Sequence, residues 1–314
     1  MIVVTGAAGY IGGQIVLQLL DAGHRVLGVD TATLNGTITH ENFEFFRGDF
    51  ALDAALGVIA QRNPTAIIHC AGTSLVGPSI KNPQLYYHNN TAKTLKLLDF
   101  VVENLPRTRV IFSSSAATYG EPVMVPCHEV DPCEPISPYG ESKLMVERIM
   151  RDYNRAYGLD YVAFRFFNAC GADPEARHGQ APGATHIIAR VLESLRDDQE
   201  FTLYGNNYPT ADGTCVRDYV HVADIARAHV LALSSMVPAG VYNLGSNTGT
   251  SNQEIITAAE RITGRQLKVV QGEQRAGDPP MLTASSAKFN TVAQDWRKYN
   301  LDDMIQHAWT WYVR

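Results

Sequence analysis

Short apolar runs alternate with amphipathic stretches along the first half of the chain. Apolar positions recur at helical spacing within the longer stretches, which predicts helices at 11–23, 52–63, 82–104 and 137–158. The runs between them are apolar throughout, rather than at every second position, as in a parallel sheet covered by helices on both faces. We predict strands at 2–5, 25–30, 43–49, 66–72, 109–115 and 161–168. The pattern therefore predicts an α/β fold with a Rossmann-like, doubly wound parallel sheet.

Beyond residue 168 this alternation loosens, and Gly, Pro and Asn become frequent. Helical spacing returns at 186–197, 222–235 and 251–263. We expect a Rossmann domain over residues 1–167 and a smaller α/β lobe over residues 168–314 that faces a substrate. Some segments of the second part are expected to return to the main sheet.

Composition narrows the class of protein without naming a function. The 314 residues are 45% hydrophobic and 18% charged, which is typical of globular proteins, and the formal net charge of −6 argues against nucleic acid or an anionic membrane as partner. No apolar run is long enough to span a bilayer, and the start "MIVVTG" lacks the features of a signal peptide. Five cysteines, an odd number, suggest free thiols in a reducing compartment. We therefore expect a cytoplasmic protein.

A glycine-rich turn follows the first predicted strand, in "VVTGAAGYIGGQ". Gly6 permits a tight turn, Gly9 lets backbone N–H groups approach a pyrophosphate, and Gly12 lets the helix pack closely on the strand. The N-terminus of the following helix offers unpaired N–H donors and a partial positive charge to phosphates. The position of the turn between a strand and a helix indicates a dinucleotide site.

Acidic residues at the next strand ends support this interpretation. Asp30 ends the second strand, where a carboxylate accepts hydrogen bonds from the adenosine ribose and repels a 2′-phosphate, so NAD is favoured over NADP. The alternative is that Asp30 only caps the next turn. Asp49 ends the third strand and is placed to hydrogen bond to the adenine edge, and the loop 69–72 lies at the same end of the sheet.

A tyrosine and a lysine four positions apart, Tyr139 and Lys143, lie on one face of the helix predicted at 137–158. Free tyrosine has a pKa near 10, roughly, and a neighbouring ammonium together with a cationic nicotinamide would favour the phenolate. A phenolate is a suitable base for a sugar hydroxyl, and Ser115, at the end of a strand, would orient that hydroxyl. By itself the pair could also be an exposed pair on an ordinary helix.

These motifs together resemble the extended short-chain dehydrogenase/reductase superfamily and, more narrowly, the UDP-glucose 4-epimerases. The resemblance extends from residue 3 to residue 280, and the run "GNNYPTADGTCVRDYVHV" (205–222) is its most specific part. It is also carried by "VTGAAGYIG", "IIHCAG", "VIFSSSAATYG", "SPYGESKLMVE", "FRFFNACGADP" and "RAGDPP".

The resemblance implies NAD as cofactor, a UDP-sugar as substrate and a homodimer formed through the helices at 82–104 and 137–158. Tyr139, Lys143 and Ser115 would be catalytic, acting on the sugar 4-OH through a transient 4-keto intermediate. The implied cofactor-binding residues are Gly6, Gly9, Tyr10, Ile11, Gly12, Asp30, Asp49, Phe50, Ala71, Gly72, Asn90, Ser113, Tyr139, Lys143 and Phe166. The implied substrate-binding residues are Ser115, Tyr139, Asn168, Tyr204, Arg217, Arg275, Asp278 and Leu282.

The sequence departs from the family pattern at two positions, and alternative functions stay open. Ser74 replaces a lysine often found in the "HxAG" loop, so one cofactor contact is lost, and Leu282 stands where some relatives carry a tyrosine that narrows the sugar pocket. Leucine leaves room for an N-acetylated hexose. Within enzymes, the alternative is an epimerase for UDP-N-acetylhexosamines or UDP-pentoses. Ala116 and Ala117 replace the Asp–Glu pair of the related 4,6-dehydratases, which disfavours dehydration. An NAD-binding sensor without catalysis is the alternative of a different class.

The cluster "PCHEVDPC", with Cys127, His128 and Cys133, suggests a metal site at first sight. No second paired cluster accompanies it, and structural zinc sites close with four ligands. We interpret it as a loop with free thiols and predict no metal.

Overall fold

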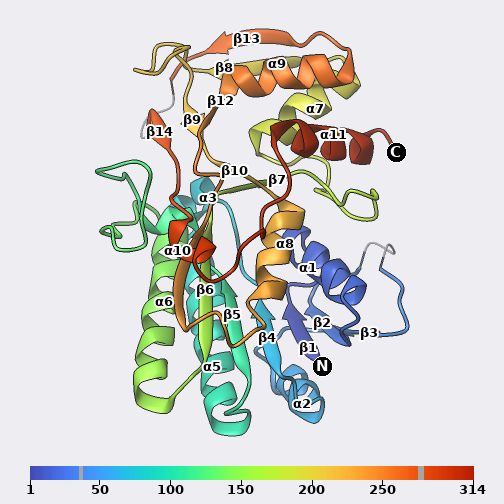
Figure 1. Cartoon of the computed structure of the whole chain (residues 1–314), viewed down its shortest axis with the longest axis vertical. Helices are drawn as coiled ribbons and strands as arrows, with labels where there is room; N and C mark the ends of the chain where they lie inside the picture. The colour runs from blue at the N-terminus through green and yellow to red at the C-terminus, as the bar shows by residue number, and fades with distance from the viewer. Residues whose placement is uncertain (35–37, 275–278) are drawn as a thin grey trace.

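A seven-stranded parallel sheet lies at the centre of the protein (Figure 1). The computed structural model describes residues 1–34, 38–274 and 279–314. The strand order is β11-β6-β5-β4-β1-β2-β3. The strands are β1 (Ile2–Thr5), β2 (Val26–Asp30), β3 (Phe43–Arg47), β4 (Ala66–His69), β5 (Arg109–Ser113), β6 (Tyr161–Phe166) and β11 (Gly240–Leu244). The predicted α/β, Rossmann-like fold is confirmed.

Helices cover both faces of this sheet. On one face, α1 (Tyr10–Asp21) and α8 (Val222–Leu231) enclose the core that contains Ile2 and Val4. On the other, α2 (Asp53–Gln61), α5 (Lys93–Asn104) and α6 (Pro138–Tyr157) enclose the core that contains Val3. Successive residues of β1 thus enter opposite cores, which is why its sequence is apolar at every position.

The later part of the chain forms a second layer of smaller elements and also contributes to the main sheet (Figure 1). β11 pairs with β6, and α8 packs on α1, although both follow residue 168. A separate core lies among α7 (Ile187–Asp197), α9 (Asn252–Thr263) and α11 (Leu301–Tyr312), beside the parallel pair β8 (Glu200–Tyr204) and β13 (Lys268–Gly272).

Short strands and helices fill the space between the two layers. β7 (Asn168–Cys170) pairs with β10 (Tyr219–His221), and β9 (Val216–Arg217) lies between β12 (Thr250–Ser251) and β14 (Met281–Leu282). The remaining short helices are α3 (Val76–Lys81), α4 (Pro83–Tyr86) and α10 (Ala287–Asn290). In the described ranges, no helix combines the length and the apolar character needed to cross a membrane.

The stretch 82–104 differs from the single helix predicted for it. It consists of α4, a π-helical turn η1 (Tyr87–Ala92) and α5. Asn90 is buried in this turn, where its side chain accepts a hydrogen bond from Thr73 N (2.7 Å) and donates to Ser142 Oγ (3.0 Å). Apolar periodicity cannot reveal a wider turn of this kind, since its partners are polar groups far along the chain.

α6 begins and ends where its sequence indicates. The Ser137 hydroxyl accepts a hydrogen bond from Gly140 N, Pro138 occupies the first turn, and the helix ends at Gly158, whose φ is 73°. These signals place Tyr139 in the first turn and Lys143 one turn later, on the side that faces the end of β5.

Replacement of Gly12 by alanine tests the close packing of α1. A Cβ at Gly12 would overlap the backbone carbonyl of Gly6, which is not a flexible neighbour. We expect Gly12→Ala to lower the free energy of unfolding by about 1–3 kcal/mol in urea denaturation, as overpacking does. Gly57→Ala in α2 is the matched control, because nothing lies within 4 Å of its Cβ, and should stabilise by about 0.5–1 kcal/mol. Equal effects of the two variants would contradict the packing argument.

Candidate active site

The glycine-rich turn lies against the loop that follows β4. Gly6 has a φ of 75°, and a Cβ there would be 2.7 Å from Ala71 N, so both its backbone conformation and its surroundings require glycine. Gly9 precedes α1, is exposed, and provides no side-chain cap for the helix. The first N–H groups of α1 are therefore open to a phosphate.

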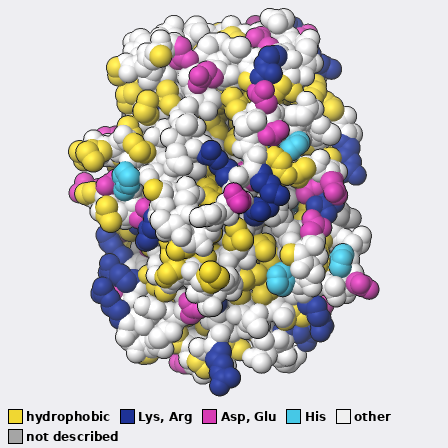
Figure 2. Space-filling view, viewed as in Figure 1, with side chains coloured by type: hydrophobic (Ala, Val, Ile, Leu, Met, Phe, Trp, Pro, Cys, Tyr) yellow, Lys and Arg dark blue, Asp and Glu magenta, His cyan; other side chains and the backbone are white. Residues whose placement is uncertain are grey.

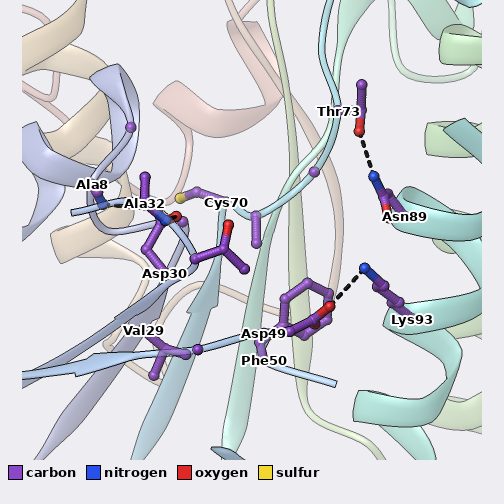
Figure 3. A pocket seen from close by; sticks show the side chains of 16 residues that line it. Ala8, Val29, Asp30, Ala32, Asp49, Phe50, Cys70, Thr73, Asn89 and Lys93 are labelled. Carbon is purple, nitrogen blue, oxygen red and sulfur yellow. Dashed lines mark hydrogen bonds and ion pairs between the residues drawn. The ribbon is translucent and has the colours of Figure 1, made fainter. Parts of the chain in front are cut away.

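A cavity of about 380 Å³ opens beside this turn at the carboxyl ends of the strands (Figure 3). Seven of the residues predicted to bind the cofactor line it, namely Gly6, Gly9, Asp30, Asp49, Phe50, Ala71 and Gly72. Thr73, Asn89 and Lys93 also line it and were missed by the sequence-based prediction. Asn89 and Lys93 are four residues apart in a helical stretch, a spacing that indicates one shared face.

Other residues predicted to bind the cofactor lie around the cavity rather than in its lining. Tyr10 donates a hydrogen bond to Gly171 O (2.7 Å), which ties the start of α1 to the second layer. Ile11 and Phe166 pack against the core under α1 and α8. A Cβ at Gly72 would lie 2.9 Å from the Asn90 side chain, so the loop after β4 is held closely on the π-helical turn.

Asp30 connects two segments of the cavity wall. One carboxylate oxygen accepts a hydrogen bond from Ala8 N in the glycine-rich turn, and the other accepts one from Ala32 N, each at 2.9 Å. The residue thus holds the next turn, as the alternative interpretation expects, and also faces the cavity. A carboxylate has about four acceptor positions, so two remain for ribose hydroxyls.

The catalytic candidates meet at the end of β5. Lys143 Nζ donates to Ser113 O (2.8 Å) and lies 4.7 Å from the centre of the Phe112 ring. The Lys143 side chain is buried, and burial lowers its pKa to about 8, against the opposing influence of Cys70 and Glu147. This ammonium is therefore held in a largely apolar environment at the edge of the sheet.

Tyr139 lies beside Lys143, whose Nζ is 6.0 Å from the centre of the phenol ring. Burial raises the pKa of Tyr139, whereas its hydrogen bond with Ser115 lowers it and the nearby Tyr86 raises it further. Among the chain's own groups, burial is the largest influence on this pKa. The expected lowering, which involves a cationic nicotinamide beside Lys143, stays a prediction.

A buried ion pair fixes α6, the helix that carries Tyr139 and Lys143, against the sheet. Arg165 on β6 contacts Glu147 on α6 through Nη2 and Oε2 at 2.6 Å, and both side chains are about 5% exposed or less. Ser114 donates to the same carboxylate from the end of β5. Glu147 lies one turn beyond Lys143, so the pair fixes α6 relative to β5 and β6.

Three of the predicted substrate-binding residues lie close together on neighbouring strands. Asn168 Nδ2 donates to Asp218 O (2.9 Å), Arg217 Nη1 donates to Pro279 O (2.8 Å), and Leu282 pairs with Arg217 in the register of β14 and β9. Leu282 also packs on the apolar cluster that contains Ala116, next to Ser115. Cys127 and Cys133 belong to that cluster too.

Tyr204 lies on β8, in a different pair of strands, where its ring faces Gly272. Arg275 and Asp278, also predicted to bind the substrate, lie outside the described residues.

The site and the fold define a class of protein. The sequence profile of the NAD dependent epimerase/dehydratase family matches residues 2–245, and the chain belongs to this family. Among curated relatives, the UDP-glucose 4-epimerase of Halalkalibacterium halodurans is 41% identical over 318 residues, covering 99% of this chain and 95% of the relative.

Solved structures of epimerases are similar to this chain over nearly its whole length. The UDP-glucose 4-epimerase of Brucella ovis in complex with NAD has a TM-score of 0.91 at 38% identity and covers 98% of this chain and 97% of its own. The UDP-glucose-4-epimerase of Stenotrophomonas maltophila, with bound NAD and formylated UDP-arabinopyranose, has a TM-score of 0.94 at 30% identity, with 99% and 97% coverage. The UDP-Glc/GlcNAc 4-epimerase of Campylobacter jejuni has a TM-score of 0.86 at 33% identity, with 99% and 98% coverage.

Burial of the Lys143 ammonium lowers the stability of the folded state, although we expect the enzyme to need this group for activity. A fall of its pKa from 10.5 to about 8 corresponds to about 3 kcal/mol of destabilisation of the folded state at pH 7. Lys143→Met removes this cost but leaves Ser113 O without its donor, which costs about 1–2 kcal/mol. We expect a variant that is inactive and about 1–2 kcal/mol more stable in urea at pH 7.

The sign of the pH dependence provides a second check. Between pH 8 and 10.5 the unfolded lysine binds more protons than the folded one, so the stability of the wild type rises with pH in that window. The advantage of Lys143→Met should therefore shrink as pH rises from 8 to 10.5. A variant several kcal/mol less stable than the wild type at pH 7 would contradict this account.

Proposed function

We propose that this protein is an NAD-dependent epimerase that inverts C4 of a UDP-hexose, interconverting UDP-glucose and UDP-galactose through a transient 4-keto intermediate. The observation that carries the proposal is the meeting of Ser115, Tyr139 and Lys143 at the end of β5. Lys143 Nζ lies 3.8 Å from a Cβ position at Gly72, which lines the cavity beside Gly6 and Asp30. Near-full-length relatives that are UDP-glucose 4-epimerases support it.

The residues present fit NAD. Gly6 and Gly9 leave the backbone of the turn free of side chains, the start of α1 is uncapped, and Asp30 offers acceptors to ribose hydroxyls. When bound, the cofactor supplies a hydride acceptor that returns the same hydrogen to the opposite face of the sugar, so no external reductant is consumed.

Side chains of the protein transfer the proton of the sugar 4-OH. Tyr139 removes the proton from the 4-OH during oxidation and returns one to O4 during reduction, while Ser115 hydrogen bonds to the hydroxyl and orients it. Lys143, fixed to Ser113 O, places a positive charge beside the phenol. Ala116 and Ala117 carry no group that can transfer a proton, which supports epimerisation over dehydration.

The second layer would hold the nucleotide part of the UDP-sugar while the sugar rotates to present its other face. We assign Asn168 and Arg217 to the diphosphate, and the hydrogen bond from Asn168 Nδ2 to the carbonyl of Asp218, the residue after Arg217, supports this. Tyr204 would pack on uracil. Arg275 would contact phosphate and Asp278 the uridine ribose, as the resemblance implies.

Leu282 is the proposed determinant of the sugar. It packs beside Ala116, next to the catalytic Ser115, and pairs with Arg217 across β14 and β9. A leucine there leaves more space than a tyrosine, so UDP-N-acetylhexosamines are a second candidate substrate class, with UDP-pentoses as a further alternative. The related Campylobacter jejuni enzyme is a UDP-Glc/GlcNAc 4-epimerase.

We further propose a homodimer formed through α5 and α6. The two helices run side by side at one face of the molecule, where Tyr153 donates to Asp99, and Leu95 and Tyr157 are exposed (Figure 1). A cytoplasmic location is proposed from the five free cysteines. Figure 2 shows acidic and basic side chains interspersed on the face in view.

Tyr139→Phe tests the mechanism and the alternative of an NAD-binding sensor. The variant lacks only the phenolic oxygen, so binding of NAD should persist, whereas conversion of UDP-galactose should fall by about 10²–10⁴-fold. Coupled detection of UDP-glucose measures the rate, and Tyr157→Phe, an exposed tyrosine on the same helix, is the matched control. Equal activity of Tyr139→Phe and wild type would remove the proposed base.

Leu282→Tyr tests the assignment of the sugar pocket. The wild type should convert both UDP-glucose and UDP-N-acetylglucosamine, and the larger side chain should reduce kcat/KM for the N-acetylated sugar by about 10–200-fold while sparing UDP-glucose. Leu52→Tyr, at an exposed leucine outside α5 and α6, controls for the added ring. No turnover of UDP-N-acetylglucosamine by the wild type would show that Leu282 does not admit it.

A further inference from the structure

The π-helical turn η1 and the first residue of α5 form one wall of the cofactor cavity. Asn89 of η1 and Lys93 of α5 both line it, and Asn89 Nδ2 donates to Thr73 Oγ1 (2.9 Å) on the opposing loop (Figure 3). This wall is therefore polar, although its sequence shows no binding motif.

Lys93 contacts Asp49 across this part of the cavity. Its Nζ lies 2.7 Å from Asp49 Oδ2, and the two side chains are 25% and 20% exposed (Figure 3). The other oxygen, Oδ1, accepts a hydrogen bond from Ala51 N at 3.0 Å. Among the described residues of the lining, Lys93 is the sole lysine or arginine, whereas Asp30 and Asp49 are acidic.

A neighbouring ion pair with the same chemistry lies outside the cavity and offers a matched comparison. One turn later, Lys96 Nζ contacts Asp53 Oδ1 at 2.8 Å, with side chains 51% and 93% exposed. It joins α5 to the start of α2 outside the cavity lining. The two pairs have the same chemistry and nearly the same distance, but only Lys93 and Asp49 face the cavity.

The bonds to Asp49 determine what its carboxylate can still accept. Of about four acceptor positions, Lys93 and Ala51 occupy two, so two are left for a donor in the cavity. Burial alone would raise the pKa of Asp49, but the hydrogen bond from Lys93 and the one from Ala51 bring that pKa below its ordinary value. Lys93 thus favours the ionised carboxylate and fixes its orientation.

We propose that Lys93 is a positioning residue for the adenine half of the cofactor, one that directs the Asp49 carboxylate at the adenine 6-amino group. This inference rests on the proposed function only in taking NAD as the ligand. A lysine that positions an acceptor makes the site selective for a base that carries a donor, because a carbonyl in its place would face the carboxylate without a hydrogen bond.

Calorimetric binding of NAD and of its hypoxanthine analogue, in which a carbonyl replaces the 6-amino group, tests the proposal. The wild type should prefer NAD by about tenfold, a typical value for one charge-assisted hydrogen bond. Lys93→Met should weaken NAD by about five- to tenfold and reduce the preference to near unity, and Lys93→Arg should restore part of it. Lys96→Met is the matched control and should behave as the wild type.

The outcomes separate the inference from the enzyme activity. A preference for NAD that is unchanged in Lys93→Met would overturn the positioning role, as would a loss of affinity shared equally by Lys96→Met. Melting temperatures of both variants show whether either substitution disturbs the fold. If the pair of Lys93 and Asp49 were only structural, Lys93→Met would lower the melting temperature without changing the preference between the two bases. A wild type that binds NAD selectively but converts no UDP-sugar would reject the proposed function and leave the role of Lys93 unchanged. A wild type that binds NAD and its hypoxanthine analogue equally well would reject the role of Lys93.

Discussion

The buried ion pair between Arg165 and Glu147 is the interaction on which the geometry of the site depends. It joins α6 to β6, and Ser114 attaches the end of β5 to the same carboxylate. Because both charges are removed from water, loss of either partner would leave the other uncompensated at a cost of about 3–5 kcal/mol. The reacting groups therefore occupy fixed positions although they come from different elements: Ser115 follows β5, whereas Tyr139 and Lys143 lie on α6.

The carboxyl edge of the parallel sheet brings two kinds of binding surface together. On one side, backbone groups dominate, since Gly6 and Gly12 permit contacts that any side chain would block. On the other side, short strands from the later part of the chain present Asn168, Arg217 and Leu282. In the proposed function, these strands hold the nucleotide while the sugar presents both faces to the same base.

The sequence was sufficient to predict six of the seven strands of the sheet, most of the helices around it and the reasons for its glycines, because those features depend on local periodicity and on backbone conformation. The seventh strand, β11, was covered only by the expectation that some later segments return to the sheet. The sequence was insufficient where partners come from distant segments. In the π-helical turn, Asn90 bonds to Thr73 and Ser142, and Lys93, which follows this turn, lines the cavity. Spacing also shows the charge beside Tyr139, but not the burial that raises the pKa of this phenol.

The central claim is that C4 is inverted by oxidation and reduction rather than by removal and return of a proton at carbon. The most direct measurement is the conversion of UDP-galactose in heavy water, with deuterium at C4 of the UDP-glucose product determined by mass spectrometry or NMR. The account predicts product without deuterium at C4, because the hydrogen is kept within the site while only the hydroxyl proton exchanges through Tyr139. Incorporation of solvent deuterium at C4 would contradict it.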